Sequence, residues 1–285
     1  DLNMDLFHQK VTDLNYRNSI FVDNTANENI SKLYADYLKE SVAIVTCNKI
    51  ACSSNFTNYL NLKQLSREYN APFLFETNVG AGLPIIDTLK NLIASGDKVT
   101  KIQAVLSGSL NFVFNNLNNE TSFAEVVDQA GIQGYTEPDP RIDLSGVDVM
   151  RKILILARES GTQLELSDIE NDSFLPKASI EADTVPEFLE TLKAEAAHFN
   201  KIYNNAATNN CRLKFVAEFD NGTAKVGLKE IPSDHPFYNL DGSDNIVLFF
   251  TVRYPVQPLI IKGAGAGADV TASGLFADII RIGNN

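Results

Sequence analysis

Apolar and polar residues follow one another along the first eighty residues in a pattern that predicts strands and helices in turn. Short apolar runs predict buried strands at residues 19–23, 42–46 and 73–76. Between them, apolar residues recur at helical spacing, which predicts amphipathic helices at residues 28–41 and 58–69. Strands that alternate with helices need crossover connections, so we expect a parallel, doubly wound sheet here, although only part of one.

The pattern changes in the middle of the chain, where helices precede a group of strands. Helices are expected at residues 83–95, 110–117, 123–130 (ended by Gly131), 145–160 and 187–203, with a strand at 100–106. Strands follow at residues 213–219, 224–230, 246–254 and 259–262, and then a helix at 270–282. Asn221-Gly222 joins the first two of these strands as a strong hairpin signal. The chain is therefore predicted to be an α/β protein, with a partial Rossmann-type parallel sheet and an α+β domain whose sheet is mainly antiparallel.

Residues 131–152 concentrate charged side chains in a stretch that is otherwise apolar or turn-forming. Four carboxylates and three cations lie here: Glu137, Asp139, Asp143, Asp148, Arg141, Arg151 and Lys152. Asp148 and Lys152 stand four residues apart in a helical pattern, so they share one helix face. The ordinary explanation is a solvated salt bridge worth a few tenths of a kcal/mol. Pro138 and Pro140 make the approach rigid, which favours a site that binds an amino acid and moves a proton.

Three segments of small residues join an expected strand to an expected helix, at residues 78–82, 106–110 and 263–269. Helix N-termini offer free N–H groups and the positive end of the helix dipole, which favour anions. The two glycine-rich segments do not fit G-x-G-x-x-G, and the serines of the third could be N-caps, so tight turns are the simpler explanation.

Asn48 and Lys49 directly follow the second strand of the expected parallel sheet. Because ligands of open α/β sheets bind at the carboxyl ends of strands, a lysine here is more informative than one on a helix surface. A solvated loop lysine remains a common alternative. Cys47 precedes the pair, but no basic partner in the sequence supports a nucleophilic thiol.

Composition narrows the classes of function. A chain of 285 residues can bury a substantial core, and we expect two domains. The net charge of −12 argues against nucleic acid or an anionic membrane as a partner. No apolar run could span a bilayer, and the first residues show no signal-peptide pattern. Three scattered cysteines fit reduced thiols and three histidines give no zinc-ligand spacing, so a soluble cytoplasmic protein is expected.

Five segments carry a family resemblance. They are TCNKIACSS (46–54), FETNVGAGLPIIDTL (75–89), LSGSLNFVF (106–114), GYTEPDPRIDLSGVDVMRKILILARE (134–159) and GAGAGADVTASGLFADIIR (263–281). In this order they resemble the homoserine dehydrogenase family, especially the homoserine dehydrogenase region of bifunctional aspartokinase–homoserine dehydrogenases. The resemblance runs from about residue 20 to the end of the chain.

The resemblance implies a reaction and a domain plan. The reaction is the NAD- or NADP-dependent interconversion of L-aspartate 4-semialdehyde and L-homoserine in threonine and methionine biosynthesis. Residues 1–76 and 264–285 correspond to the nucleotide-binding domain, and residues 77–263 to the catalytic and dimerisation domain. A homodimer or higher homo-oligomer is implied, with an aspartokinase fused upstream as a further expectation.

Site residues carry over at matching positions. Lys152, Asp148 and Lys49 are implied at the reacting centre, with Lys49 as a proton carrier. Substrate-binding residues are Glu137, Asp143, Tyr135 and Ser109. The implied cofactor-binding residues are Asn48, Lys49, Gly265 and Gly267. Backbone carbonyls of Glu76, Val79 and Ala81 match a binding site for a monovalent cation, Na⁺ or K⁺.

Three departures from the family pattern are visible. Ile142 stands where relatives often carry a second aspartate, and Cys47 replaces a usual proline. These residues also lack the family's first β–α unit with its glycine-rich pyrophosphate loop. Either they are a fragment, or the molecule carries that unit outside them, and by themselves they are expected to bind NAD(P) poorly.

Two alternatives follow. One is a truncated, non-catalytic dimerisation module of the same parent protein. The other, an aldehyde dehydrogenase of the aspartate-semialdehyde type, needs a nucleophilic cysteine with a histidine partner and has no persuasive pair here.

Overall fold

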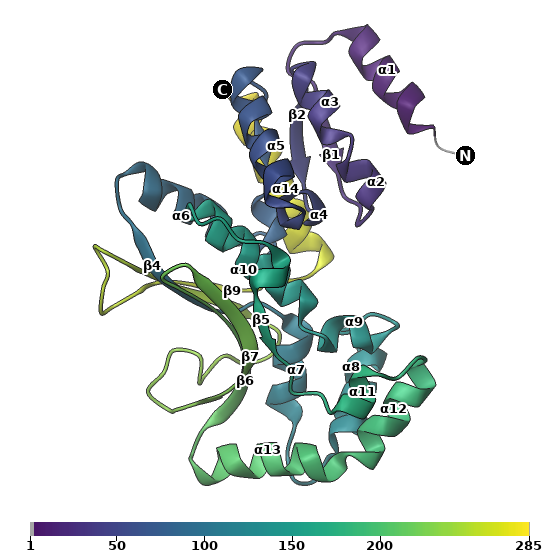
Figure 1. The fold of residues 1–285 in the computed structure, drawn as a ribbon, viewed down its shortest axis with the longest axis vertical. Helices are drawn as coiled ribbons and strands as arrows, with labels where there is room; N and C mark the ends of the chain where they lie inside the picture. Colours follow the sequence, from purple (N-terminus) through teal and green to yellow (C-terminus); the bar gives the residue numbers. More distant parts are fainter. Residues whose placement is uncertain (1–2, 285) are drawn as a thin grey trace.

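The computed structural model describes residues 3–284. Its two halves are each built around one sheet, and α10 (Val147–Glu159) lies between them (Figure 1). One large apolar core runs through both halves, from Tyr34 and Ile44 in the first to Ile153, Phe215 and Phe249 in the second. The two sheets are therefore parts of one packed body.

The first half contains a parallel sheet of three strands in the order β1-β2-β3: Ile20–Asp23, Ala43–Thr46 and Phe73–Leu74. Successive residues of β2 point to opposite faces, as strand geometry requires. Ile44 packs into the main core with α3 (Tyr34–Lys39) and α5 (Phe56–Glu68). Ala43 and Val45 contact Leu275 and Ile282 of α14 (Ala268–Gly283). Helices on both faces confirm the partial doubly wound arrangement.

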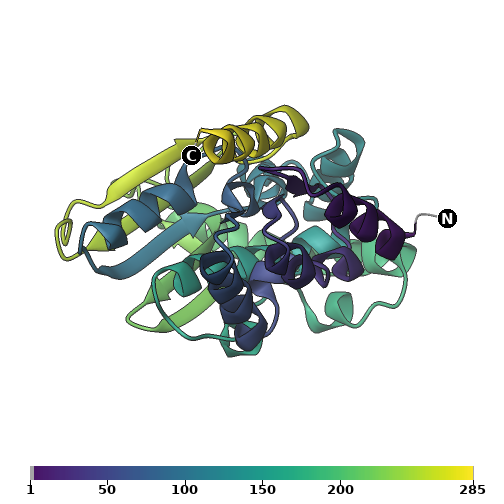
Figure 2. The same ribbon diagram turned by 90° about the horizontal axis from the view of Figure 1, so that it is seen from above.

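Helix α14 is the last element, yet it lies beside the first strands of the chain. Seen from above, this helix, drawn in yellow, returns to the purple N-terminal segments (Figure 2). The remaining elements of this half are α1 (Met4–Leu14), α2 (Glu28–Ser31) and α4 (Ile50–Ser53). No helix within residues 3–284 is both long and apolar enough to cross a membrane.

The second half contains a six-stranded sheet in the order β5-β7-β6-β4-β8-β9, in which only the β5–β7 pair is parallel. The strands are β4 Val99–Val105, β5 Glu170–Asp172, β6 Arg212–Asp220, β7 Thr223–Ile231, β8 Asn245–Thr251 and β9 Leu259–Gly263. Asn221 and Gly222 form the predicted two-residue hairpin turn, both with positive φ (46° and 95°). Such a turn matches the twist of the flanking strands.

Helices cover one face of this sheet, and the loop 232–244 covers the other with Phe237 and Leu240. The helices are α6 Ile85–Ala94, α7 Gly108–Asn116, α8 Phe123–Ile132, α9 Pro140–Leu144, α10, α11 Lys177–Ile180, α12 Val185–Ala194 and α13 Ala196–Thr208. Two 3-10 turns, η1 (Glu76–Asn78) and η2 (Leu166–Asp168), complete the chain. The predicted antiparallel second domain is confirmed.

Several predicted boundaries were wrong for identifiable reasons. The helix expected at 187–203 is two helices, because the backbone turns at Glu195 (φ −93°, ψ 20°). The helix expected at 28–41 is broken at Leu33, whose N–H bonds to the carbonyl three residues back instead of four. Helix α8 passes Gly131 and ends at Ile132, just before Gly134, which has φ 75°.

Candidate active site

A cleft of about 460 Å³ lies between the two halves, next to the segment that follows β2. Its walls come from that segment, the β4–α7 turn, residues 134–152 and the β9–α14 turn. Eight residues predicted from the sequence line it: Lys49, Ser109, Tyr135, Glu137, Asp143, Asp148, Lys152 and Gly267. The fold thus brings together residues that are more than two hundred positions apart.

Asp148 lies between two lysines. Its Oδ2 is 2.8 Å from Lys152 Nζ and its Oδ1 is 3.4 Å from Lys49 Nζ. The α10 helix supplies Asp148 and Lys152 on one face, as predicted, whereas Lys49 comes from the other half of the molecule. This cluster is therefore a contact across the cleft, with one carboxylate facing two ammonium groups.

The environment of Lys152 differs from the sequence-based interpretation. An exposed helix face was expected, but only 12% of the Lys152 side chain is exposed. The reason is the end of β4, where the Leu106 carbonyl accepts a hydrogen bond of 2.7 Å from Lys152 Nζ. Two of the three ammonium hydrogens thus have fixed acceptors, so the direction of the remaining one is set.

Asp148 stays ionised in this setting. Burial by itself would raise the pKa of Asp148, but the Lys152 and Lys49 ammonium groups outweigh it and hold the pKa well below the ordinary value. A carboxylate with such a low pKa is a poor proton acceptor at neutral pH. Its role is therefore to hold and orient the two lysines.

A second carboxylate, Asp143, organises the opposite wall. Its Oδ1 accepts a 2.8 Å hydrogen bond from Ser109 Oγ, and its Oδ2 accepts one of 2.9 Å from the Glu137 N–H. Ser107 Oγ caps α7 and lies 3.2 Å from Ser109 Oγ. The ring of Tyr135 stacks on the ring of Phe112, with 4.2 Å between the ring centroids. The four predicted substrate-binding residues therefore share one wall.

Asp139 and Arg141, in contrast, have structural roles. Asp139 caps α9 by accepting from the Arg141 N–H, and its carboxylate also pairs with the Arg141 guanidinium at 2.6 Å. Arg141 donates further to the Ala182 carbonyl. Arg141 lies in α9 and Asp139 directly precedes it, while Pro140 occupies the first turn of the helix.

The predicted cofactor-binding residues lie at two depths. Lys49 and Gly267 line the cleft. Asn48 is buried behind it and donates 3.0 Å hydrogen bonds to Asp23 Oδ2 and the Asn27 carbonyl. Gly265 packs so closely on Asn245 that an added Cβ would lie 2.2 Å from Asn245 Cγ. Asn48 and Gly265 therefore shape the surface that Lys49 and Gly267 present.

The turn at residues 76–82 supports α6. Glu76 is buried, and its carboxylate accepts hydrogen bonds from the N–H groups of Ile86 (2.7 Å) and Asp87 (2.8 Å). Burial, with Asp87 nearby, raises the Glu76 pKa to about 7. Within residues 3–284, no three His, Cys, Asp or Glu side chains gather to hold a metal ion. The carbonyl-based cation site at Glu76, Val79 and Ala81 remains a prediction.

Two parts of the site had little or no signal in the sequence. Ser243 lines the cleft from the end of the 232–244 loop, and an added Cβ on Gly108 would lie 3.2 Å from it. Only the folded sheet brings these positions together. Ile142 also lines the cleft, and the residue is 58% exposed.

Cys47 is no better a nucleophile than expected, because burial raises the pKa of its thiol.

Models of known families match nearly the whole chain. The model described as homoserine dehydrogenase matches residues 84–280, and the one described as homoserine dehydrogenase, NAD binding domain, matches residues 1–76.

Named relatives agree with these matches. A bifunctional aspartokinase/homoserine dehydrogenase 2 from Zea mays, chloroplastic, is 43% identical over 94% of this chain and 29% of its own length. A homoserine dehydrogenase from Schizosaccharomyces pombe is 42% identical over 93% of this chain and 72% of its own length. The chain therefore spans less than a third of the maize relative.

Solved structures show the same fold. A Candida auris protein of unknown function superposes with a TM-score of 0.94 at 40% identity, covering 100% of this chain and 81% of the other. A hyperthermophilic archaeal homoserine dehydrogenase in complex with NADPH has a TM-score of 0.71 at 27% identity, covering 93% of this chain and 71% of the other.

Proposed function

Because this chain belongs to the homoserine dehydrogenase family, we propose that the polypeptide carrying it interconverts L-homoserine and L-aspartate 4-semialdehyde with NAD or NADP. The observation that carries this proposal is the cleft in which Asp148 holds Lys152 and Lys49 opposite the carboxylates of Asp143 and Glu137. One wall offers proton donors and the other offers negative charge. An amino acid with a reactive oxygen at its far end matches both walls.

The lysines handle the proton. In the direction of aldehyde reduction, the Lys152 ammonium donates to the aldehyde oxygen and gives it a proton as the alcohol forms. The Leu106 carbonyl and Asp148 fix the other hydrogens of this ammonium, so it reaches the substrate in one orientation. Lys49, on the other side of Asp148, is placed to return a proton to the site. Homoserine oxidation uses the same groups in reverse.

The opposite wall binds the amino-acid end of the substrate. The carboxylates of Glu137 and Asp143 attract its ammonium group, and Ser109 fixes the Asp143 side chain. Tyr135, stacked on Phe112, closes this side of the cleft. These contacts hold the reacting carbon at a constant distance from Lys152, which is the positioning that such catalysis requires.

The nicotinamide cofactor supplies the hydride transfer when it is bound. The lining of the cleft fits such a group. Gly267 has φ 117°, and an added Cβ there would meet no atom closer than 3.7 Å, so its backbone is open to a flat ring. Lys49 and Gly267 would hold the cofactor on this side, on a surface that Asn48 and Gly265 shape from behind. The NADPH complex of the archaeal relative supports this assignment.

The wider assembly is also part of this proposal. We place the catalytic and dimerisation domain at residues 77–263, between the two parts of the nucleotide-binding domain, and we expect a homodimer in the cytoplasm. Exposed Val252, Val256 and Ile260 near the β8–β9 end supply apolar surface for such an interface. An aspartokinase domain is fused to the maize relative, and an upstream fusion is proposed here. Light scattering of the purified protein tests the homodimer, and sequencing of the full-length mRNA tests the upstream fusion.

The decisive experiment is homoserine-dependent reduction of NAD⁺ and NADP⁺, followed by absorbance, on the full-length polypeptide that carries these residues. L-2-aminobutyrate is the matched control, because it keeps the ammonium and carboxylate groups but has no hydroxyl to oxidise. We expect turnover with homoserine, and inhibition without turnover by the control. A folded protein that binds the cofactor but oxidises no homoserine would contradict the proposal.

A further inference from the structure

Both ends of helix α10 contact the short segment that contains helix α4. At the start of α10, Asp148 pairs with Lys49, the residue that directly precedes α4. At its end, Arg158 Nη1 donates a 2.8 Å hydrogen bond to the carbonyl of Cys52, the third residue of α4. Asp148 and Arg158 lie about 15 Å apart along the helix at 1.5 Å per residue. One rigid helix thus holds one four-residue helix at two separate points.

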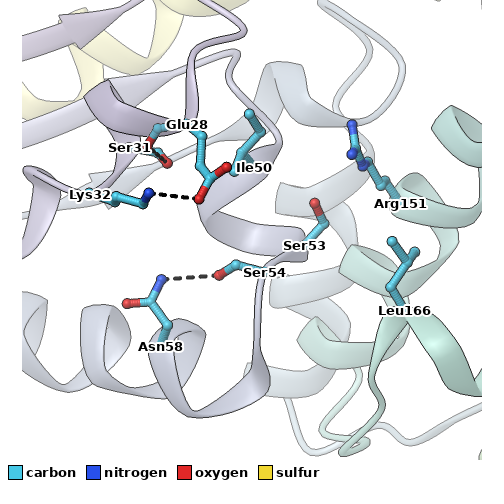
Figure 3. Close-up of a pocket in the computed structure, with 9 residues that line it drawn as sticks. All are labelled: Glu28, Ser31, Lys32, Ile50, Ser53, Ser54, Asn58, Arg151 and Leu166. Carbon is cyan, nitrogen blue, oxygen red and sulfur yellow. Dashed lines mark hydrogen bonds and ion pairs between the residues drawn. The ribbon is translucent and has the colours of Figure 1, made fainter. Parts of the chain in front are cut away.

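Beside α4 lies a hollow whose other walls come from α2, the start of α5 and α10. It measures about 430 Å³ and is lined by Ile50, Ser53 and Ser54 on one side and Arg151 on the other. In Figure 3, Ser54 is joined to Asn58 by a hydrogen bond, and Arg151 lies beyond Ser53 on the α10 side. Ala51 and Cys52 pack the other face of α4 into the core, but the face toward the hollow has no such packing. On that face, the contacts of Lys49 and Cys52 with α10 hold the segment.

The surroundings of Arg158 hold its guanidinium group firmly in place. The residue is 3% exposed, and its guanidinium also donates to the Leu164 carbonyl (3.1 and 2.9 Å) and to Glu165 Oε2 (3.0 Å). Glu165 in turn accepts from the N–H of Phe56, the first residue of α5. A planar guanidinium with several fixed acceptors allows little rotation or sliding. The segment from α4 to the start of α5 is therefore tied to the end of α10.

The neighbouring residue, Glu159, offers a contrast on the same helix turn. Its side chain is 3% exposed and accepts from Tyr59 Oη and Lys63 Nζ, both on α5. It is as buried as Arg158 and as dependent on charged partners, but it makes no hydrogen bond to α4. Loss of Arg158 or of Glu159 should destabilise the protein. Of the two, Arg158 is the one that holds the segment that carries Lys49.

We propose that Arg158 is a positioning residue, which holds α4 against the end of α10 and thereby sets the approach of Lys49 to Asp148. This inference rests on the proposed function for its effect on turnover, but not for its effect on Lys49. At 3.4 Å the Lys49–Asp148 ion pair is long, and the Asp148 side chain is 44% exposed. The persistence of this pair therefore depends on the position of α4. Arg158 acts at a distance, through the backbone of α4.

The test compares Arg158→Gln with Glu159→Gln in the full-length protein. The first readout is the rate at which Lys49 is acetylated, measured by peptide mass spectrometry against the exposed Lys201. An ammonium held against a carboxylate inside a cleft is shielded from the reagent. We expect Arg158→Gln to raise the Lys49 rate to that of Asp148→Asn, and Glu159→Gln to leave it unchanged.

The second readout is steady-state kinetics. Arg158→Gln should lower kcat for homoserine by about 10- to 100-fold, the effect of a small misplacement, with little change in KM. Glu159→Gln should lower the melting temperature without this loss. If Arg158→Gln does not fold, Arg158→Lys replaces it, since lysine keeps the charge but cannot reproduce the forked contacts.

The outcomes separate the two proposals. A wild-type protein without homoserine turnover overturns the proposed function, while the Lys49 labelling still decides the role of Arg158. Unchanged Lys49 labelling and unchanged kcat in a folded Arg158 variant overturn the positioning role. Equal effects of both variants on labelling also overturn it, because the contact with α4 would then not be what matters.

Discussion

Lys152 donates to a carbonyl and to a carboxylate, and both acceptors belong to the protein. A change to methionine keeps most of the side-chain volume but removes all the donors. We expect kcat for homoserine to fall about 10²- to 10⁴-fold, the usual contribution of a positioned proton donor. Stability should fall by about 1–3 kcal/mol, because the Leu106 carbonyl loses its partner. Kinetics and urea unfolding check the two effects separately, with Lys177→Met as the control. Wild-type turnover in Lys152→Met would remove it from the mechanism.

Glu137 presents its charge to the cleft without a protein cation paired to it in the part of the chain described. Removal of that charge by Glu137→Ala should therefore weaken substrate binding more than chemistry. We expect KM for homoserine to rise about tenfold, the lower end for one charged hydrogen bond, with kcat nearly unchanged. Glu120→Ala, at an exposed site outside the cleft, is the control. An unchanged KM would count against a binding role for Glu137.

At the scale of elements, the β9–α14 turn packs on the start of β8 through one tight contact. Gly265 leaves no room for a side chain next to Asn245. Gly265→Ala should force the β9–α14 turn away from β8 and destabilise the protein by about 1–3 kcal/mol, the usual result of overpacking. In Gly283→Ala, at an open position of α14, stability should stay the same or rise slightly. Urea denaturation of both variants measures the difference, and equal stabilities would show that the turn can adapt.

Elements with a strong local signal could be predicted from the sequence. The 220–223 hairpin follows from Asn221-Gly222, and the placement of Asp148 and Lys152 on one face follows from helix geometry. Helix ends were less predictable, because apolar residues such as Phe188, Leu192 and Phe199 keep their spacing across the turn at Glu195. The spacing of apolar residues shows which residues are buried. When a helix ends and a new one begins in another direction, and the same residues stay buried, that spacing does not change.

The candidate site shows the same limit. Charged residues near one another in sequence were found, Lys49 was found from its place after the second strand, and the family resemblance supplied Gly267. The Leu106 carbonyl that holds Lys152 could not be found, because a backbone acceptor has no signature in the side chains. Ser243 was missed because its place in the cleft depends on the order of strands in the sheet. Such contacts are properties of the fold alone.

At the scale of the whole molecule, Glu76 joins η1 to α6, and its own N–H donates to Asp278 of α14. Burial raises its folded pKa to about 7, above the ordinary 4.5, so the native state binds the proton more tightly than the unfolded chain does. This group's contribution to stability is therefore fully present below about pH 4.5 and is lost as pH rises through about 7.

Glu76→Gln removes this titration. The stability of the variant relative to wild type should rise as pH increases from about 4.5 to about 7, and should be constant above that range. Thermal unfolding of both proteins at several pH values measures the difference. Asp87 and Asp278 face Glu76 and are present in both proteins, so the change made between the two is the loss of the Glu76 carboxyl group. A difference that does not vary with pH would show that Glu76 is ionised throughout this range.

The return of α14 to the parallel sheet has a consequence for the order in which the protein can be made. The strands of that sheet lie within the first 76 residues, but the side chains that cover the face of Ala43 and Val45 are Leu275 and Ile282. During synthesis, therefore, these strands keep one apolar face uncovered until residues 268–283 emerge from the ribosome. A ribosome stalled before that point would expose a half-covered sheet, and this is the surface on which we would expect a chaperone to be found.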